Sequence, residues 1–127
     1  RQSANGAYAS VIPKFVEFLK NNEPLSITGD GEQTRDFVNI KDVVSANILA
    51  MKENKVSKGE VLNIGGSNQY SINYIAKLIG GEIFYIPFRI EPRKTQAGIE
   101  KAKEFLNWAP RVMLEDGIAE LKKYNNI

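Results

Sequence analysis

A chain of 127 residues with 43% hydrophobic and 25% charged residues has the size and composition of one folded domain. It contains no cysteine and no histidine, which excludes disulfides, Cys/His zinc sites and nucleophilic catalysis by a Cys–His or Ser–His pair. A net charge of +2 without a clustered basic face argues against nucleic-acid binding, and no apolar run has the length of a membrane span. The lack of cysteine also fits a cytoplasmic location.

Helices and strands are predicted to alternate in the first half of the chain. Apolar residues at helical spacing predict a helix that begins near Pro13 and ends at residues 21–24. A short strand is expected at Leu25–Thr28, followed by a glycine turn at residues 29–31 and a second strand at residues 35–40. This order indicates the α/β class.

From residue 42 onward, helices and strands continue to alternate. Asp42 is predicted to cap a helix that reaches about Lys52, and apolar residues on most sides of that helix predict its burial. The remaining predicted elements are, in chain order, a strand at residues 61–64, a helix capped by Ser71 and stopped by glycines 80 and 81, a strand at Ile83–Ile86, an irregular basic loop at residues 87–96, and helices near residues 99–106 and 114–124. Trp108 is predicted to anchor the end of the first of those two helices in the core.

A resemblance to a known family is carried by residues 29–44, which read GDGEQTRDFVNIKDVV. This segment resembles a signature of extended short-chain dehydrogenases that act on nucleotide sugars, such as UDP-glucose 4-epimerases. Residues 5–15 (NGAYASVIPKF), 60–65 (EVLNIG) and 87–108 resemble further segments of that family, so the resemblance covers nearly the whole chain. It implies that residues 1–127 form the C-terminal, sugar-nucleotide-binding domain of a Rossmann-type α/β enzyme whose NAD-binding half is absent.

The resemblance also predicts that this chain lacks the catalytic machinery of the family. The NAD fingerprint needs a run of glycines between a strand and a helix, and the Gly65–Gly66 pair is too short for it. The family's catalytic tyrosine is followed four residues later by lysine, and none of the five tyrosines has that neighbour. We therefore expect no catalytic, cofactor-binding or metal-binding residue here, and NAD only in the parent enzyme. Arg1 resembles the arginine of the family's Tyr-Gly-Pro-Arg segment, which predicts a parent that begins upstream.

Two arginines are the leading candidates for binding the ligand. Arg35 follows the glycine turn, and its planar guanidinium matches two phosphate oxygens, so the resemblance assigns it to the diphosphate. The competing interpretation is an ion pair with Asp36 or Glu32. Arg89 is assigned to the diphosphate as well, but the family pattern there is Arg-Pro-Gly-Glu, and this chain is one residue shorter and lacks the glycine. Arg93 is therefore an alternative to Arg89.

Four further residues are candidates for the nucleoside end of the ligand. Ala7 to Val11 would present backbone groups to a uracil or thymine base, as implied by the resemblance. Asn5 is a candidate contact, although an Asn-Gly pair is typical of a turn. Ile27 is a candidate for packing on the ribose or base, although an apolar strand residue is also typical of a core.

The leading functional hypothesis is binding of a UDP-sugar or related NDP-sugar as part of an NAD-dependent epimerase. A 4,6-dehydratase acting on a dTDP-sugar, a non-catalytic sugar-nucleotide-binding module and an interaction domain without a small ligand remain alternatives. Convergence of Arg35 and Arg89 on one cleft would favour ligand binding over the interaction domain. Strands such as residues 61–64 would normally lie beside strands of the absent half, so we expect exposed edges that promote self-association.

Overall fold

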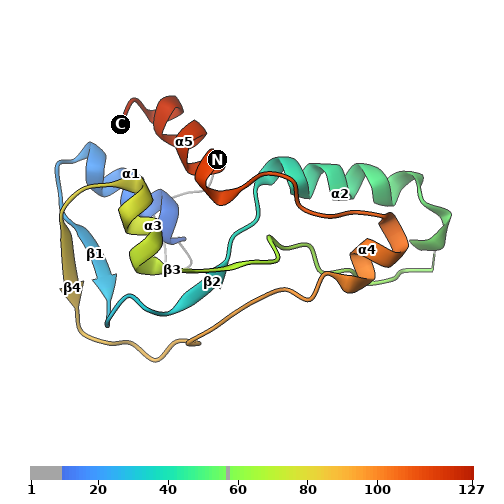
Figure 1. Ribbon diagram of the computed structural model, residues 1–127, viewed down its shortest axis with the longest axis horizontal. Helices are drawn as coiled ribbons and strands as arrows, with labels where there is room; N and C mark the ends of the chain where they lie inside the picture. Colours follow the sequence, from blue (N-terminus) through green and yellow to red (C-terminus); the bar gives the residue numbers. More distant parts are fainter. Residues whose placement is uncertain (1–9, 57) are drawn as a thin grey trace.

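The structure is a computed structural model that describes residues 10–56 and 58–127. Its elements are, in chain order, α1 (Val11–Lys20), β1 (Leu25–Thr28), β2 (Thr34–Asp36), α2 (Ile40–Lys52), the 3-10 helix Asn54–Val56, β3 (Gln69–Ser71), α3 (Ile72–Ile79), β4 (Ile83–Ile86), α4 (Glu100–Leu106) and α5 (Leu114–Asn125). They form an elongated molecule with α1, α3, α5, β1 and β4 at one end, α2 and α4 at the other, and the β2–β3 pair between them (Figure 1). The α/β class predicted from the alternation is confirmed.

The larger hydrophobic cluster surrounds a parallel pair of strands. β1 and β4 pair in parallel, with Leu25 opposite Ile83, and the β1 side chains Leu25 and Ile27 are 0% and 1% exposed. Helix α3 packs on them through Ile75 and Ile79, which are buried as its helical spacing predicts. Fully burying side chains of this size contributes about 1.5–3 kcal/mol each to folding.

Local signals set the ends of α3 as predicted. The hydroxyl oxygen of Ser71 accepts a hydrogen bond from the N–H of Tyr74 at 3.1 Å, which is N-terminal capping. Gly80 ends the helix with φ of +90°, a conformation that side chains with a Cβ rarely adopt.

A second hydrophobic cluster joins α2 to α4. It consists of Ala46, Ile99, Ala102, Leu106 and Trp108. The indole N–H of Trp108 donates to the carbonyl of Asp42 at 3.2 Å and to the hydroxyl of Ser45 at 2.9 Å, and the residue is 2% exposed. The predicted role of Trp108 as a core anchor is confirmed.

The strand predicted at residues 35–40 is shorter than expected. β2 ends at Asp36, because its antiparallel partner β3 spans three residues and its last pair is Asp36 with Gln69. Phe37 then leaves the sheet, and Asn39 caps α2, its side-chain oxygen accepting from the N–H of Lys41 at 2.9 Å. The prediction that Asp42 caps this helix was therefore wrong. Asp42 lies inside the first turn, where its carboxylate binds another segment of the chain.

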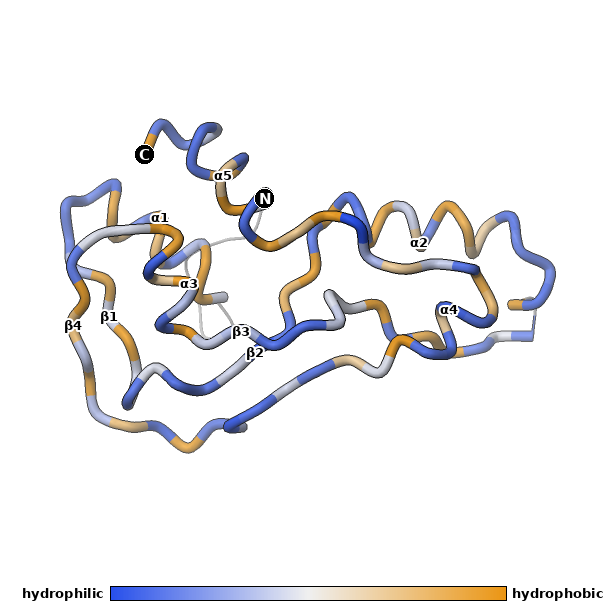
Figure 2. Tube along the Cα trace, viewed as in Figure 1, coloured by the Kyte–Doolittle hydropathy of each residue, from blue (hydrophilic) through white to orange (hydrophobic). Residues whose placement is uncertain are grey.

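Two further predictions at the α2 end were also wrong. Helix α2 was expected to be buried. Apolar residues recur along it (Figure 2), and three on one face are exposed, with exposed fractions of 69% for Ile40, 48% for Val44 and 46% for Ile48. Residues 61–64 were expected to form a strand, but they have no strand beside them in the described ranges and form none. An apolar helix face needs another element to pack against, and a strand needs a partner strand. Helix α4 packs against only one side of α2, so the exposed stripe on α2 has no such partner among the described residues.

Candidate functional site

The candidate site is built around Arg35, in the middle of β2. Its guanidinium forms an ion pair with Glu91 through Nη2, and Nη1 donates to the carbonyls of Thr34 at 2.8 Å and Pro92 at 2.7 Å. The Arg35 and Glu91 side chains are 23% and 31% exposed, so the pair is partly shielded from water. The competing interpretation named Asp36 or Glu32 as the partner of Arg35. An internal ion pair does form, but with Glu91.

The loop at residues 87–96 lies along β2 and carries Glu91 to Arg35. The N–H of Thr34 donates to the carbonyl of Arg93 at 2.9 Å, and the N–H of Thr95 donates back to the carbonyl of Thr34 at 3.2 Å. These bonds make a short parallel bridge between Thr34 and Lys94. Glu91 also accepts from the amide of Gln33 at 3.2 Å, and Gln33 is 6% exposed. The irregular loop predicted from the sequence is therefore held in place by backbone bonds at its second half.

A second ion pair closes the same corner of the molecule. Arg93 binds both carboxylate oxygens of Asp30, at 2.7 and 2.9 Å, and the N–H of Glu32 donates to Asp30 at 2.9 Å. The hydrogen bond from Arg93 lowers the pKa of Asp30 from 3.8 to about 2, with the Glu32 N–H as the next contribution. The same pairing raises the pKa of Arg93. Arg93, the alternative to Arg89, is therefore already bound in a fork geometry to a carboxylate.

We expect the stability contribution of Asp30 to disappear in acid. Because the folded pKa of about 2 lies below the ordinary 3.8, the contribution is complete above the unfolded pKa and is lost as the pH falls through the folded pKa. Urea unfolding of the chain and of Asp30→Asn should differ at about pH 6 and converge near pH 2. A difference that stayed constant over this range would contradict the assignment.

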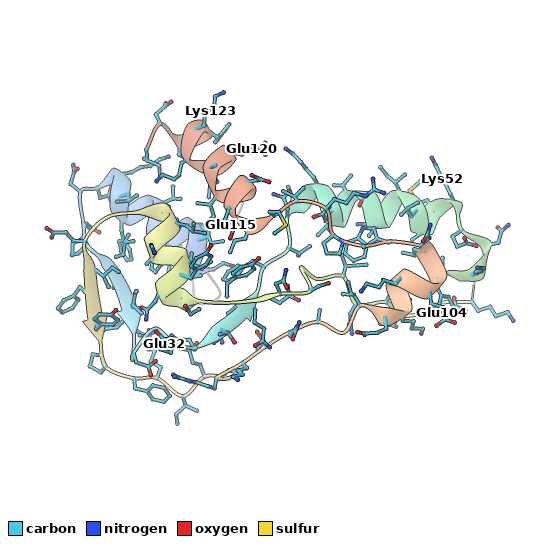
Figure 3. All side chains as sticks on the ribbon, viewed as in Figure 1. Glu32, Lys52, Glu104, Glu115, Glu120 and Lys123 are labelled. Atoms are coloured by element: carbon cyan, nitrogen blue, oxygen red, sulfur yellow. The ribbon has the colours of Figure 1, made fainter. Side chains whose placement is uncertain are left out.

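The turn that precedes β2 is locked to α3. Asn73 donates to the carbonyl of Asp30 at 2.9 Å and to the carboxylate of Glu32 at 2.6 Å (Figure 3). Its N–H also donates to the carbonyl of Gly31 at 3.0 Å. Gly31 has φ of +73°, and a Cβ there would lie 2.0 Å from the Asn73 side chain, so glycine is required at this position. The turn that precedes Arg35 is therefore held in a defined position by α3.

Arg35 retains hydrogen-bonding capacity for a ligand. A guanidinium has five N–H donors, and three are used by Glu91, Pro92 and Thr34. The Nε–H and one N–H of Nη2 have no acceptor among the residues that the structure describes. An anion with two or more oxygens could bind there or replace the Glu91 carboxylate.

The other predicted contacts have different surroundings. Arg89 is exposed and lies two residues before Glu91, so the two candidate arginines belong to segments that touch, although no described residue pairs with Arg89. Val11 is half-buried in the first turn of α1. Ile27 is 1% exposed in the core, which leaves its side chain almost no surface for a ribose or base. Asn5 and Ala7 lie outside the described residues.

The aspartates near the site hold the backbone. Asp36 accepts from the N–H of Gly66 at 2.6 Å and from that of Ala97 at 3.1 Å, which joins three segments at one carboxylate. A Cβ on Gly66 would lie 2.2 Å from the carbonyl oxygen of Phe37, so this glycine permits a close approach of two backbones. The glycine pair is thus explained by packing.

Sequence reasoning did not select Glu91 or Gln33 for the site. Glu91 is 56 residues from Arg35 in the sequence, and the signal that could have found it is the acidic residue of the family's Arg-Pro-Gly-Glu pattern. A pocket of about 260 Å³ lies elsewhere, between residues 66–70 and 109–114, and neither Arg35 nor Arg89 lines it. Across residues 10–56 and 58–127 no acidic cluster could hold a metal ion. None of the helices in those ranges is long and apolar enough to cross a membrane.

Comparison with known proteins places this chain in a family. Residues 1–65 match the NAD dependent epimerase/dehydratase family, and the chain belongs to it. The UDP-glucose 4-epimerase of Thermotoga maritima, solved with UDP-glucose, is 38% identical with a TM-score of 0.87, over 99% of this chain and 42% of that one. The UDP-glucuronic acid 4-epimerase of Bacillus cereus, solved with UDP-glucuronic acid and NAD, is 32% identical with a TM-score of 0.80, over 92% of this chain and 40% of that one.

The relatives include enzymes with a different reaction. A UDP-N-acetyl-alpha-D-glucosaminuronate decarboxylase of Bacillus cytotoxicus is 34% identical over 94% of this chain and 40% of its own length. The chain therefore spans about 40% of the length of each of these three relatives. The predicted resemblance is confirmed, and so is the α/β fold, which matches about 40% of the length of these relatives. The three relatives named here each have a UDP-sugar in their name.

Proposed function

We propose that this chain binds the diphosphate of an NDP-sugar, with a UDP-sugar as the preferred ligand, as the C-terminal part of an NAD-dependent 4-epimerase. The observation that supports this proposal is the Arg35 guanidinium, which is fixed where the glycine turn, β2 and the 87–96 loop meet. Two backbone carbonyls orient it and two of its N–H groups have no described acceptor. A fixed cation of this kind loses little side-chain entropy when it binds phosphate.

The Glu91 carboxylate is the group that a phosphate would replace. Carboxylate and phosphate both offer a guanidinium two oxygens with shared negative charge. Glu91 therefore holds Arg35 in a binding geometry when no ligand is present. A bound diphosphate would bring negative charge next to Glu91, so the carboxylate must then leave Arg35 and turn to solvent or to Gln33.

The chemistry of the whole enzyme is proposed from the relatives. NAD bound to the parent would supply the chemistry of hydride transfer at the sugar. This chain would fix the nucleotide, and with it the position of the sugar, while hydride and proton transfer would rest on the part that carries the family's tyrosine and lysine. Decarboxylating relatives at 32–34% identity support decarboxylation of a UDP-uronic acid as a second candidate reaction.

The exposed stripe of α2 is proposed as the surface that the rest of the enzyme covers. Its residues Ile40, Val44 and Ile48 recur every four positions on one face, and Val61 in the next segment is 80% exposed. A helix face of this kind usually packs against another element. Val61 belongs to residues 61–64, which have the sequence pattern of a strand but no partner strand among the described residues.

Titration calorimetry with UDP-glucose, UDP and uridine tests the binding proposal. We expect UDP and UDP-glucose to bind, and uridine to bind at least tenfold more weakly, because it cannot reach Arg35 with phosphate oxygens. Glu91→Gln should tighten UDP binding by about three- to tenfold by removing the competing charge, and leave uridine unchanged. Glu104→Gln is the matched control, because Glu104 lies on α4 at one end of the molecule, away from β2 (Figure 3).

Two results would contradict the binding proposal, and a third would contradict the displacement of Glu91. Equal affinity for UDP and uridine would show that no phosphate contact is made. No heat with any of the three ligands would show that this chain alone does not bind the nucleotide. Weaker UDP binding by Glu91→Gln would mean that Glu91 positions Arg35 in the bound state as well, against the displacement described above.

A further inference from the structure

The outer edge of β4 is an uncharged and exposed strand edge. Residues 83–88 read IFYIPF, and the exposed fractions are 41% for Ile83, 59% for Phe84, 51% for Tyr85 and 66% for Phe88. In the described part of the chain, β4 pairs with β1 on one side and with no strand on the other. Figures 1 and 2 show this mostly apolar strand at the rim of the molecule. Natural edge strands are usually protected by charged side chains, which β4 lacks.

The backbone directions of β4 follow from its pairing with β1. The carbonyl of Glu82 accepts from the N–H of Leu25 at 2.7 Å, and that of Ile86 accepts from the N–H of Gly29 at 3.0 Å. Backbone groups alternate in direction along a strand, so the even-numbered residues bond to β1. The N–H and C=O groups of Ile83 and Tyr85 therefore point to the open edge.

We propose that β4 pairs with the β4 strand of a second copy of this chain, antiparallel and about a two-fold axis, to make one four-stranded sheet across two molecules. Because Ile83 and Tyr85 carry the open groups, each Ile83 exchanges two hydrogen bonds with Tyr85 of the other copy. This register places the Phe84 side chains of the two copies directly opposite each other, at a site without cross-strand hydrogen bonds. Such sites bring side chains closest together.

A second copy fits this edge better than an unrelated strand does. A two-fold interface needs a surface that is complementary to itself, and an uncharged strand meets its own copy without repulsion. The opposed Phe84 rings form an aromatic cross-strand pair, which is a favourable pair type. Covering the exposed aromatic side chains of two copies buries on the order of 1,000 Å² in total, which suits a weak dimer. We expect half-dissociation at roughly tens of micromolar or higher concentrations, because interfaces of less than about 1,200 Å² are weak.

Sedimentation velocity on the 127-residue chain over a range of concentrations tests the interface and its register. The wild type should sediment as a dimer at the highest concentrations. Phe84→Lys should sediment as a monomer throughout, because it sets two lysines opposite each other, which destabilises a strand pair. Ile83→Lys, one residue away, should weaken the dimer less, because its lysine faces Tyr85. Val44→Glu on α2 should leave the dimer unchanged.

Disulfide formation gives a second measurement that does not depend on a disruptive charge. The chain has no cysteine, so Phe84→Cys introduces a single thiol. Opposed residues at such a site have Cα atoms about 4.5 Å apart, within the range that a disulfide spans. Mild oxidation should link Phe84→Cys into dimers faster than Ala119→Cys, whose thiol would be exposed on α5.

Three outcomes would overturn the proposal. The first is a wild-type chain that stays monomeric at every concentration. The second is a dimer that Val44→Glu dissociates and Phe84→Lys does not, which would place the interface on α2. The third is equal rates of cross-linking for Phe84→Cys and Ala119→Cys.

Discussion

Replacing Arg35 by alanine is expected to weaken UDP binding by about 10- to 100-fold. Hydrogen bonds between a charged donor and a charged acceptor contribute about 1.5–3 kcal/mol, and each 1.4 kcal/mol corresponds to a factor of ten in affinity. The effect should be absent for uridine, because the loss concerns the phosphates alone. Calorimetric titration of UDP and uridine into both proteins measures the difference.

Two control variants separate binding by Arg35 from its part in the fold. Arg35→Lys keeps the charge and loses the planar fork, so its affinity should lie between those of the wild type and the alanine variant. Arg93→Ala should change UDP affinity little, because Arg93 is already bound to Asp30 through both of its Nη atoms. If Arg93→Ala loses binding and Arg35→Ala keeps it, Arg93 is the phosphate ligand. If Arg35→Ala unfolds the chain, as circular dichroism would show, Arg35→Lys alone decides the question.

Elements with local signals were predicted well from the sequence. Ser71 and Gly80 set the ends of α3 by capping and by a positive φ, and both depend on residues within one helical turn. The core position Ile75 follows from the helical spacing of apolar residues in the same way. The family resemblance rests on residues 29–44, where the glycine turn and β2 are continuous in sequence.

The errors concern interactions between distant segments. Asp42 was expected to cap a helix, but it binds the N–H groups of residues 111 and 112. These residues are 69 and 70 positions away, so the local sequence pattern does not reveal the contact. The partner of Arg35 was sought at Asp36 and Glu32 for the same reason, and the loop geometry supplies Glu91. The strand pattern at residues 61–64 indicates β structure, but a strand forms only where another strand supplies its hydrogen bonds.

Replacing Asp42 by alanine is expected to cost about 3 kcal/mol of folding free energy, the largest effect on stability among the polar residues considered. Asp42 is 4% exposed, and its two carboxylate oxygens accept from the N–H groups of Arg111 and Val112, both at 3.0 Å. Alanine would leave two partly buried N–H donors without their partners, and each donor that water does not reach costs about 1–3 kcal/mol. Urea unfolding followed by circular dichroism measures the change, with Asp116→Ala in the exposed first turn of α5 as the control.

The consequence of Asp42→Ala for the candidate site distinguishes a local effect from a global one. Asp42 ties the segment after α4 to α2, whereas Arg35 is held by the glycine turn and the 87–96 loop at the other hydrophobic cluster. Hydrogen exchange should therefore accelerate at the amides of Arg111 and Val112 and remain slow at Thr34, whose N–H bonds to Arg93. Under conditions where the variant is still folded, its UDP affinity should equal that of the wild type. A parallel loss of protection at Thr34 would show instead that the two clusters unfold as one unit and that the site depends on both.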